Sequence, residues 1–159
     1  MNLKQFFIAV PAALLLVAAG AANAGESVKK WGHGAYATVV LDVLELDEGH
    51  SVMWWRGEGV EVDDDPSSPT HLNTGDCVLV LETMPDETYS GSGFCTFTDR
   101  DGDKYFLKHW VGSGMEESRY EYTGGTGKWT GATGGGTYVL EELTDTLSAF
   151  RYKGVIELP

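Results

Sequence analysis

Apolar and β-branched residues occur along this chain in short runs that are separated by turn-forming residues. The runs cover residues 36–46, 51–55, 77–83, 94–98, 104–111, 119–123, 137–143 and 147–158. Between successive runs stand segments typical of hairpin turns, namely Asp47-Glu48-Gly49, Pro85-Asp86, Asp101-Gly102 and Thr144-Asp145. No run keeps a 3.6-residue apolar period long enough to predict a helix. The pattern therefore predicts an all-β fold of about eight strands, and by itself it fits an antiparallel barrel and a sandwich equally well.

Residues 63–75 interrupt this pattern. The segment DDDPSSPTHLNTG contains two prolines and almost no apolar residues, which predicts a long loop. Long ordered loops often act as lids over functional sites, whereas others are solvated excursions. The sequence leaves both alternatives open.

The first 24 residues have the organisation of a secretory signal peptide. Lys4 precedes an apolar stretch over residues 6–19, which is interrupted by Pro11 and followed by the small residues Ala22-Asn23-Ala24. A membrane-spanning helix would need about 20 apolar residues, and no basic cluster follows this shorter stretch. We therefore predict that residues 1–24 are a cleaved signal peptide and that residues 25–159 form one domain without membrane insertion. The protein is then exported, to the periplasm or out of the cell.

Acidic residues dominate the chain beyond this leader. Residues 25–159 carry 24 acidic and 10 basic side chains, a formal charge of −14, because Lys4 is the only charged residue of the leader. Such a surface repels phosphate backbones and anionic lipid headgroups, which argues against nucleic acid and membrane surfaces as partners. Apart from Asp63-Asp64-Asp65 the carboxylates are scattered, as expected for charge that only keeps a protein soluble.

The two cysteines are predicted to form a disulfide. An even pair of cysteines in an oxidising compartment is typically bridged. Pro85-Asp86-Glu87, a good turn, lies midway between Cys77 and Cys95, so a hairpin with that turn places the cysteines directly opposite each other. A reactive or metal-binding thiolate finds no support, since there is no CxxC motif and no histidine beside either cysteine.

Two motifs that suggest ligand chemistry do not match their templates. In residues 99–103 (DRDGD), Gly102 stands at the fourth position and Trp110 at the twelfth, whereas an EF-hand needs Gly sixth and Glu twelfth. We predict a hairpin turn with solvated aspartates there. The glycine-rich run 124–136 lacks the spacing of a phosphate-binding or dinucleotide-binding loop and predicts a sharp bend between strands.

Histidine spacing likewise predicts no metal site and no cofactor. The four histidines, His33, His50, His71 and His109, show no H-x-H or H-x-x-x-H spacing.

Aromatic side chains are the remaining candidates for ligand contact. Within the strand-like runs they are Trp54, Trp55, His109, Trp110, Tyr120 and Tyr122. Because alternate residues of a strand face opposite sides, one member of each adjacent pair is expected to face the inside of a barrel. For any single one of these residues, ordinary core packing is a simpler explanation than ligand contact.

Several glycine and aromatic motifs resemble a known family. These are Gly124-Gly125-Thr126-Gly127-Lys128-Trp129, the glycines 131 and 134, and Tyr152-Lys153-Gly154 near the end. Residues 122–154 thereby resemble the C-terminal half of the allene oxide cyclase and dirigent protein barrels. Gly91-x-Gly93-Phe94-Cys95 and residues 99–103 are similar to bacterial exported relatives, so the resemblance covers roughly residues 90–158.

The resemblance implies a single antiparallel eight-stranded, calycin-like barrel with a lumen. Plant members are often oligomeric, which makes a homo-oligomer compatible with it. Their cyclase chemistry uses lumen residues from the N-terminal strands, where this sequence departs from the pattern, so no catalytic residue carries over.

Three functional hypotheses follow. The first is an exported, non-catalytic barrel that binds a small apolar molecule in its lumen. The second is a lumenal cyclase or isomerase acting on a lipid-like or phenolic substrate, with Glu58, Glu82 or His109 as the polar group inside. The third is an acidic interaction or inhibitor protein.

Overall fold

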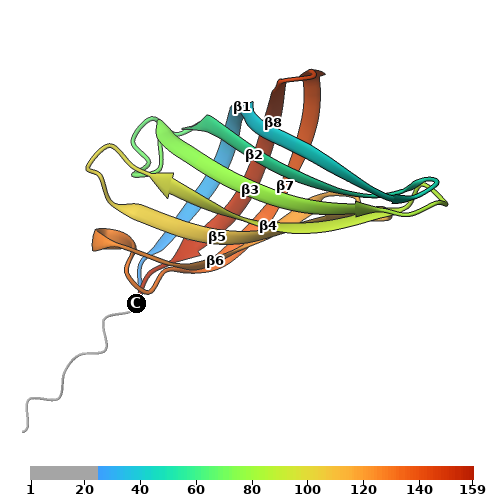
Figure 1. Cartoon of the computed structure of the whole chain (residues 1–159). Coiled ribbons are helices and arrows are strands. Elements are labelled where there is room, and N and C mark those ends of the chain that lie inside the picture. The colour runs from blue at the N-terminus through green and yellow to red at the C-terminus, as the bar shows by residue number, and fades with distance from the viewer. Residues whose placement is uncertain (1–24) are drawn as a thin grey trace, which may run out of the picture.

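The polypeptide folds into a closed barrel of eight antiparallel strands. The computed structural model describes residues 25–159, and the predicted signal peptide, residues 1–24, lies outside the described residues. The strands are β1 (Ser27–Asp47), β2 (His50–Asp63), β3 (Asn73–Thr83), β4 (Tyr89–Thr98), β5 (Lys104–Gly112), β6 (Ser118–Gly125), β7 (Thr133–Thr144) and β8 (Leu147–Glu157), with a 3-10 helix η1 (Gly127–Trp129) between β6 and β7. Each strand pairs with the next, and β8 closes the barrel against β1 (Figure 1). The predicted all-β barrel is confirmed and the sandwich alternative is wrong.

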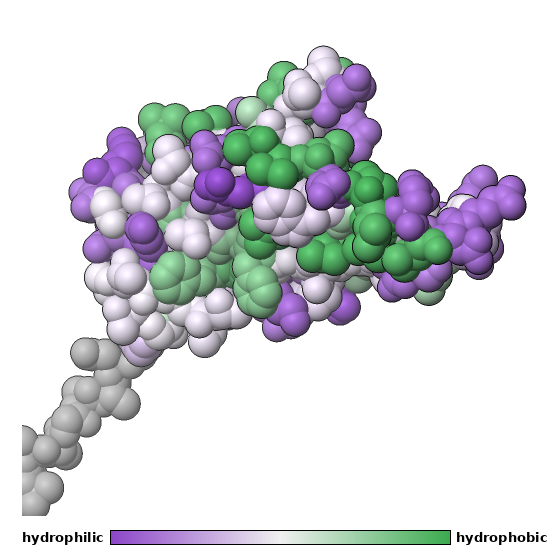
Figure 2. Space-filling view, in the orientation of Figure 1, coloured by the Kyte–Doolittle hydropathy of each residue, from purple (hydrophilic) through white to green (hydrophobic). Residues whose placement is uncertain are grey.

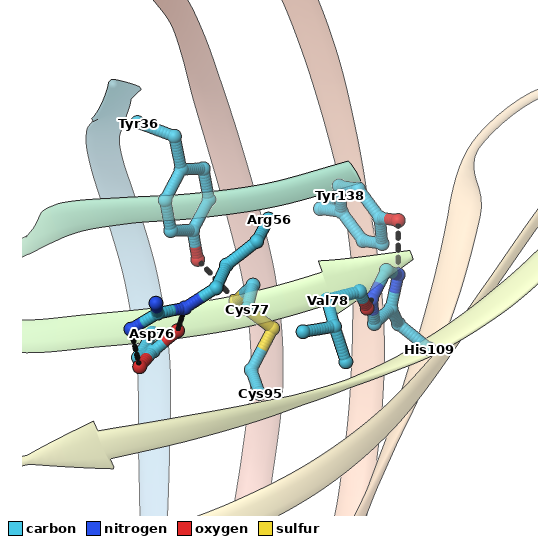
Figure 3. Close-up of a disulfide and its surroundings, with 8 residues drawn as sticks. All are labelled: Tyr36, Arg56, Asp76, Cys77, Val78, Cys95, His109 and Tyr138. Atoms are coloured by element: carbon cyan, nitrogen blue, oxygen red, sulfur yellow. Dashed lines mark hydrogen bonds and ion pairs between the residues drawn. A yellow bond between two sulfur atoms is a disulfide. The ribbon is translucent and has the colours of Figure 1, made fainter. Parts of the chain in front are cut away.

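The β3–β4 hairpin carries the predicted disulfide. Cys77 pairs directly with Cys95 in the strand register, and the two are covalently joined inside the barrel (Figure 3). The Tyr36 hydroxyl lies 3.2 Å from Cys77 Sγ and must be the donor, because a disulfide sulfur carries no hydrogen. The bridge thus ties two neighbouring strands and also contacts β1 across the interior.

Aromatic rings fill the barrel by packing onto inward-facing glycines. A Cβ at Gly57 would overlap the Trp55 ring, one at Gly59 would overlap Tyr36, and one at Gly75 would overlap Phe97. The glycines therefore supply the room that the rings occupy, which is the role of glycine in a close approach. The resulting core contains the buried aromatic residues Tyr36, Phe97, Tyr105, Tyr120, Tyr122, Trp129, Phe150 and Tyr152. These rings therefore fill much of the barrel interior.

The two ends of the barrel differ. At one end, β1 loses its partner β8 after Ala37, and β7 loses its partner β6 after Tyr138. Beyond these points β1–β4 continue as one flap and the β7–β8 hairpin as another, and the two diverge (Figure 1). We call the space between the flaps the open mouth. The opposite end, which holds η1 and the loop between β2 and β3, is called the closed end.

Two predicted boundaries are wrong. The expected loop 63–75 is shorter, because β2 continues to Asp63 and β3 already starts at Asn73. The first strand begins at Ser27 rather than at residue 36. Its first half alternates inward Lys30, Gly32 and Gly34 with outward residues, so it lacks the apolar pattern on which the prediction relied.

Candidate functional site

A buried ion pair lies at the centre of the closed end. Lys30 on β1 is 1% exposed, and its Nζ lies 2.7 Å from Oε2 of Glu61 on β2. Lys30 also donates to the Tyr105 hydroxyl (2.9 Å), which donates a short hydrogen bond to the same Glu61 oxygen. The Asn73 amide donates to the Tyr105 hydroxyl as well. Four strands thereby contribute to one polar cluster, which we call the Lys30 cluster: Lys30, Glu61, Asn73 and Tyr105.

Aromatic rings enclose this ion pair. Lys30 Nζ lies 4.7 Å from the centroid of Tyr105 and 5.0 Å from that of Tyr152, within the range of cation–π attraction. Burial lowers the pKa of Lys30, and the neighbouring Glu61 carboxylate counteracts part of that effect. Burial also raises the pKa of Tyr105 well above its usual value. These groups are sealed from solvent, so they stabilise and position one another rather than contact a ligand from outside.

The loop between β2 and β3 seals the closed end. Asp63, which is 1% exposed, accepts hydrogen bonds from the hydroxyls of Ser68 (3.1 Å) and Thr70 (2.9 Å). The buried carboxylate at the end of β2 thus holds residues 68–70 of the loop, whereas residues 64–67 are exposed to solvent.

The turn between β4 and β5 contributes a third buried carboxylate. Asp99 accepts a hydrogen bond from the Trp129 indole (2.8 Å) and pairs with Lys128 (3.0 Å). Asp99 is only 6% exposed, so the prediction of solvated aspartates is wrong for this residue, although the hairpin turn itself is present. The indole of Trp129 is fully buried and needs a partner for its N–H, which explains why the carboxylate turns inward.

His109 and Tyr138 meet at the base of the open mouth. His109 Nε2 lies 3.1 Å from the Val78 carbonyl, which can only accept, so Nε2 carries the proton. Nδ1 then accepts from the Tyr138 hydroxyl at 3.0 Å (Figure 3). Burial lowers the pKa of His109 and raises the pKa of Tyr138 to about 12, so both groups are neutral near pH 7. The pair is a fixed, uncharged polar contact in an otherwise apolar region.

Apolar side chains line the open mouth above this pair. Cross-strand partners share a face, so Leu41 and Val43 lie on the same face as Trp55 and Met53, with which they pair. Leu140 pairs with the inward Phe150 on the other flap. Leu41, Val43 and Leu140 are nevertheless 53%, 48% and 46% exposed. The inner faces of the two flaps therefore carry an apolar surface that the barrel itself does not cover.

The predicted aromatic residues divide between the inside and the outside. Trp55, His109, Tyr120 and Tyr122 face inward, where Trp55 packs edge-on against Tyr36 and its indole donates to Thr38. Trp54 and Trp110, the strand neighbours of Trp55 and His109, lie on the outer surface because successive residues alternate. These two are therefore not lumen residues.

The predicted lumenal carboxylates also lie outside. Glu58 pairs with Arg56 on the outer surface, and Glu82 pairs with His50. Among the carboxylates that do point inward, Glu61 pairs with Lys30. Neither Glu61 nor Lys30 was among the candidates. Strand alternation from Trp55 would have placed Glu61 inside, so the signal was available in the sequence.

Comparisons with known proteins identify the fold alone. No protein-family model and no curated protein matches the chain. Fifteen solved chains match it in structure. One of them is the pterocarpan synthase dirigent protein GePTS1, which is 10% identical, with a TM-score of 0.55 over 98% of this chain and 99% of that chain. The chain therefore has a dirigent-like barrel fold.

Proposed function

We propose that this protein is an exported binding protein that holds a small, largely apolar molecule at the open mouth of its barrel. The observation that carries this proposal is the exposed apolar lining formed by Leu41, Val43 and Leu140 on facing flaps. A monomer seldom leaves a contiguous apolar surface uncovered unless something binds there. Because aromatic rings fill the barrel below, the ligand would rest on Trp55 and the His109–Tyr138 pair rather than enter a deep lumen.

The polar base of the mouth favours a ligand with one hydroxyl group that can donate a hydrogen bond. The Tyr138 hydroxyl donates a hydrogen bond to His109, so the lone pairs of its oxygen remain free to accept a hydrogen bond from a ligand. A phenol or alcohol with an apolar body therefore fits the arrangement. The solved relative named above is a pterocarpan synthase, and a small aromatic ligand for this chain is in keeping with that likeness of fold.

Two observations count against the alternative of a lumenal cyclase or isomerase. Both nitrogens of His109 are bonded within the protein, so the imidazole would have to break a contact before exchanging a proton with a substrate. Glu61 is buried against Lys30 at the closed end, below the filled part of the barrel. Ligand binding without catalysis requires neither a free imidazole nor an accessible carboxylate.

Export agrees with the covalent structure of the chain. A disulfide between Cys77 and Cys95 is typical of proteins that mature in an oxidising compartment. Among residues 25–159, no helix has the length and apolar character needed to cross a membrane.

A pair of substitutions on one strand tests the proposed mouth. Leu41 faces the mouth and Leu44 faces the outer surface, yet both are exposed, at 53% and 63%. Leu41→Asp should weaken binding of the neutral probe 4-hexylphenol at least tenfold, since burying a leucine on a ligand contributes about 1.5–3 kcal/mol. Leu44→Asp should leave the affinity unchanged. Equal affinities for the two variants, measured by calorimetry, or no binding by the unmodified protein, would contradict the proposal.

A further inference from the structure

The barrel wall has a gap between β6 and β7. These strands share only four residue pairs, from Ser118↔Tyr138 to Glu121↔Gly135, fewer than any other neighbouring strands of the described barrel. Beyond Glu121, β6 runs on to Gly125 without pairing to β7. A cleft of about 580 Å³ occupies this part of the wall, within the range of small-molecule sites.

The cleft combines the outward Trp110 with two charged side chains of opposite sign, and the inward Tyr120 and Tyr122 also line it. Trp110 on β5 and Arg119 on β6 are cross-strand partners on the outer surface, and Glu121 follows on the same face. Gly134, Gly135 and Gly136 contribute no side chains to the β7 side, which keeps the cleft open. Trp110 therefore lies outside the lumen and lines the cleft between β6 and β7.

The charged groups of the cleft are not engaged elsewhere. Within residues 25–159, neither Arg119 nor Glu121 takes part in a salt bridge or a side-chain hydrogen bond. By contrast Arg56, on the same outer surface, is held by both Asp76 and Glu58. Arg119 and Glu121 therefore offer a free donor and a free acceptor beside an indole ring.

This combination selects against most ligand classes. An anion would be repelled by Glu121 and by the strongly negative protein, and a cation by Arg119 and by Lys108, whose Nζ lies 5.0 Å from the Trp110 centroid. A purely apolar molecule would cover both charged groups without satisfying them, which is costly. A neutral molecule with a flat C–H face and several hydroxyls meets all three demands, because hydroxyls both donate to a carboxylate and accept from a guanidinium.

We propose that the β6–β7 cleft binds a neutral saccharide. One pyranose ring stacks on Trp110, and its hydroxyls bond to Arg119 and Glu121. The site lies on the outer wall and not at the mouth, so this proposal can be tested independently of the proposed apolar ligand.

The test uses the full chain and a matched pair of tryptophan variants. Neutral oligosaccharides such as cellobiose, maltotriose and diacetylchitobiose are titrated into ¹⁵N-labelled protein. At least one should shift the Trp110 indole and the amides of residues 134–136, with a Kd at or below about 1–10 mM. Trp110→Ala should weaken that binding at least tenfold. Trp54→Ala removes another outward tryptophan of the same barrel and should leave the affinity unchanged.

Three outcomes would overturn the proposal. They are the absence of shifts with every saccharide, an equal loss of affinity in both variants, and displacement of the saccharide from the cleft by neutral 4-hexylphenol at lower concentration. A loss confined to Trp110→Ala, accompanied by weaker binding in Glu121→Gln, supports it.

Discussion

The buried tyrosines should make this protein unfold cooperatively in alkali. Six of the seven tyrosines have a pKa above the usual value of 10 because burial disfavours the phenolate, and these are Tyr36, Tyr105, Tyr120, Tyr122, Tyr138 and Tyr152. A group with a raised pKa in the folded state keeps its proton there while the unfolded chain loses it. Its stabilising contribution is therefore complete below pH 10 and is lost as the pH rises from 10 toward the folded value.

The size of the effect follows from the number of protons. Each tyrosine that ionises only on unfolding costs about 1.4 kcal/mol per pH unit well above pH 10. Six of them together remove about 2–3 kcal/mol of stability at pH 10 and about 8–9 kcal/mol at pH 11, compared with a typical total of about 5–15 kcal/mol. Lys30 acts in the opposite direction. Because its pKa is lowered in the folded state, its contribution to stability rises with pH up to about 10.5, and it involves only one proton.

The assay follows tyrosinate absorbance and near-UV circular dichroism together between pH 8 and 12. We expect one steep transition in both signals, reversible on return to pH 8. Tyr122→Phe should make the transition less steep by about one proton. Tyr89→Phe, which removes the surface tyrosine (44% exposed), should not change it. Gradual ionisation of all tyrosines near pH 10, with the dichroism intact, would show that water reaches the rings and would refute the filled barrel.

Two further substitutions test the covalent and ionic links of the interior. Lys30→Met leaves Glu61 buried without its partner and should lower the free energy of unfolding in urea by about 3–5 kcal/mol. The double variant Lys30→Met/Glu61→Leu should recover most of that loss. A single variant as stable as the parent protein would contradict the buried ion pair. Replacing both Cys77 and Cys95 by Ala opens a link between residues 18 apart and should cost about 3 kcal/mol. An unchanged urea midpoint after this replacement would mean that the bridge does not restrict the unfolded chain.

Local chemistry made the hairpins predictable. The turn Pro85-Asp86 sets the register of β3 and β4, and that register alone places Cys77 opposite Cys95. Turn residues and alternation are short-range signals, so the strand number and the disulfide follow from the sequence. The closure of β8 onto β1 is a long-range contact, and the resemblance of the C-terminal half indicated it where the apolar pattern did not.

The interior was harder to predict because its contacts join residues that are far apart in the sequence. By their residue types alone, Lys30, Gly32 and Gly34 do not predict a strand. In the structure the two glycines make room for aromatic rings from other strands. Lys30 pairs with a carboxylate that is 31 residues away in the sequence. In β1 the register shifts between Thr38 and Val40, which reverses the faces of the residues that follow. No sequence pattern marks that bulge, so the inward position of Leu41 could not be derived from that of Tyr36.

The exposed apolar mouth and the outer cleft depend on where strands stop pairing. Figure 2 shows that apolar side chains also gather on the outer face of the β1–β4 flap, which lies in front of the β7–β8 hairpin in this view. The sequence predicts apolar strands in this region, but it does not show that β8 leaves β1 after Ala37, which exposes the inner-face residues Leu41 and Val43.

The location of a bound apolar molecule tests the central claim most directly. In ¹H–¹⁵N spectra of the protein titrated with 4-hexylphenol, shifts should concentrate at Leu41, Val43, Leu140 and the Trp55 indole. The amides of Lys30 and Glu61, which lie below the filled core, should not move. Shifts centred on Lys30 and Glu61 would mean that the barrel is hollow to its closed end, and the absence of any shift would mean that the mouth is not a binding site.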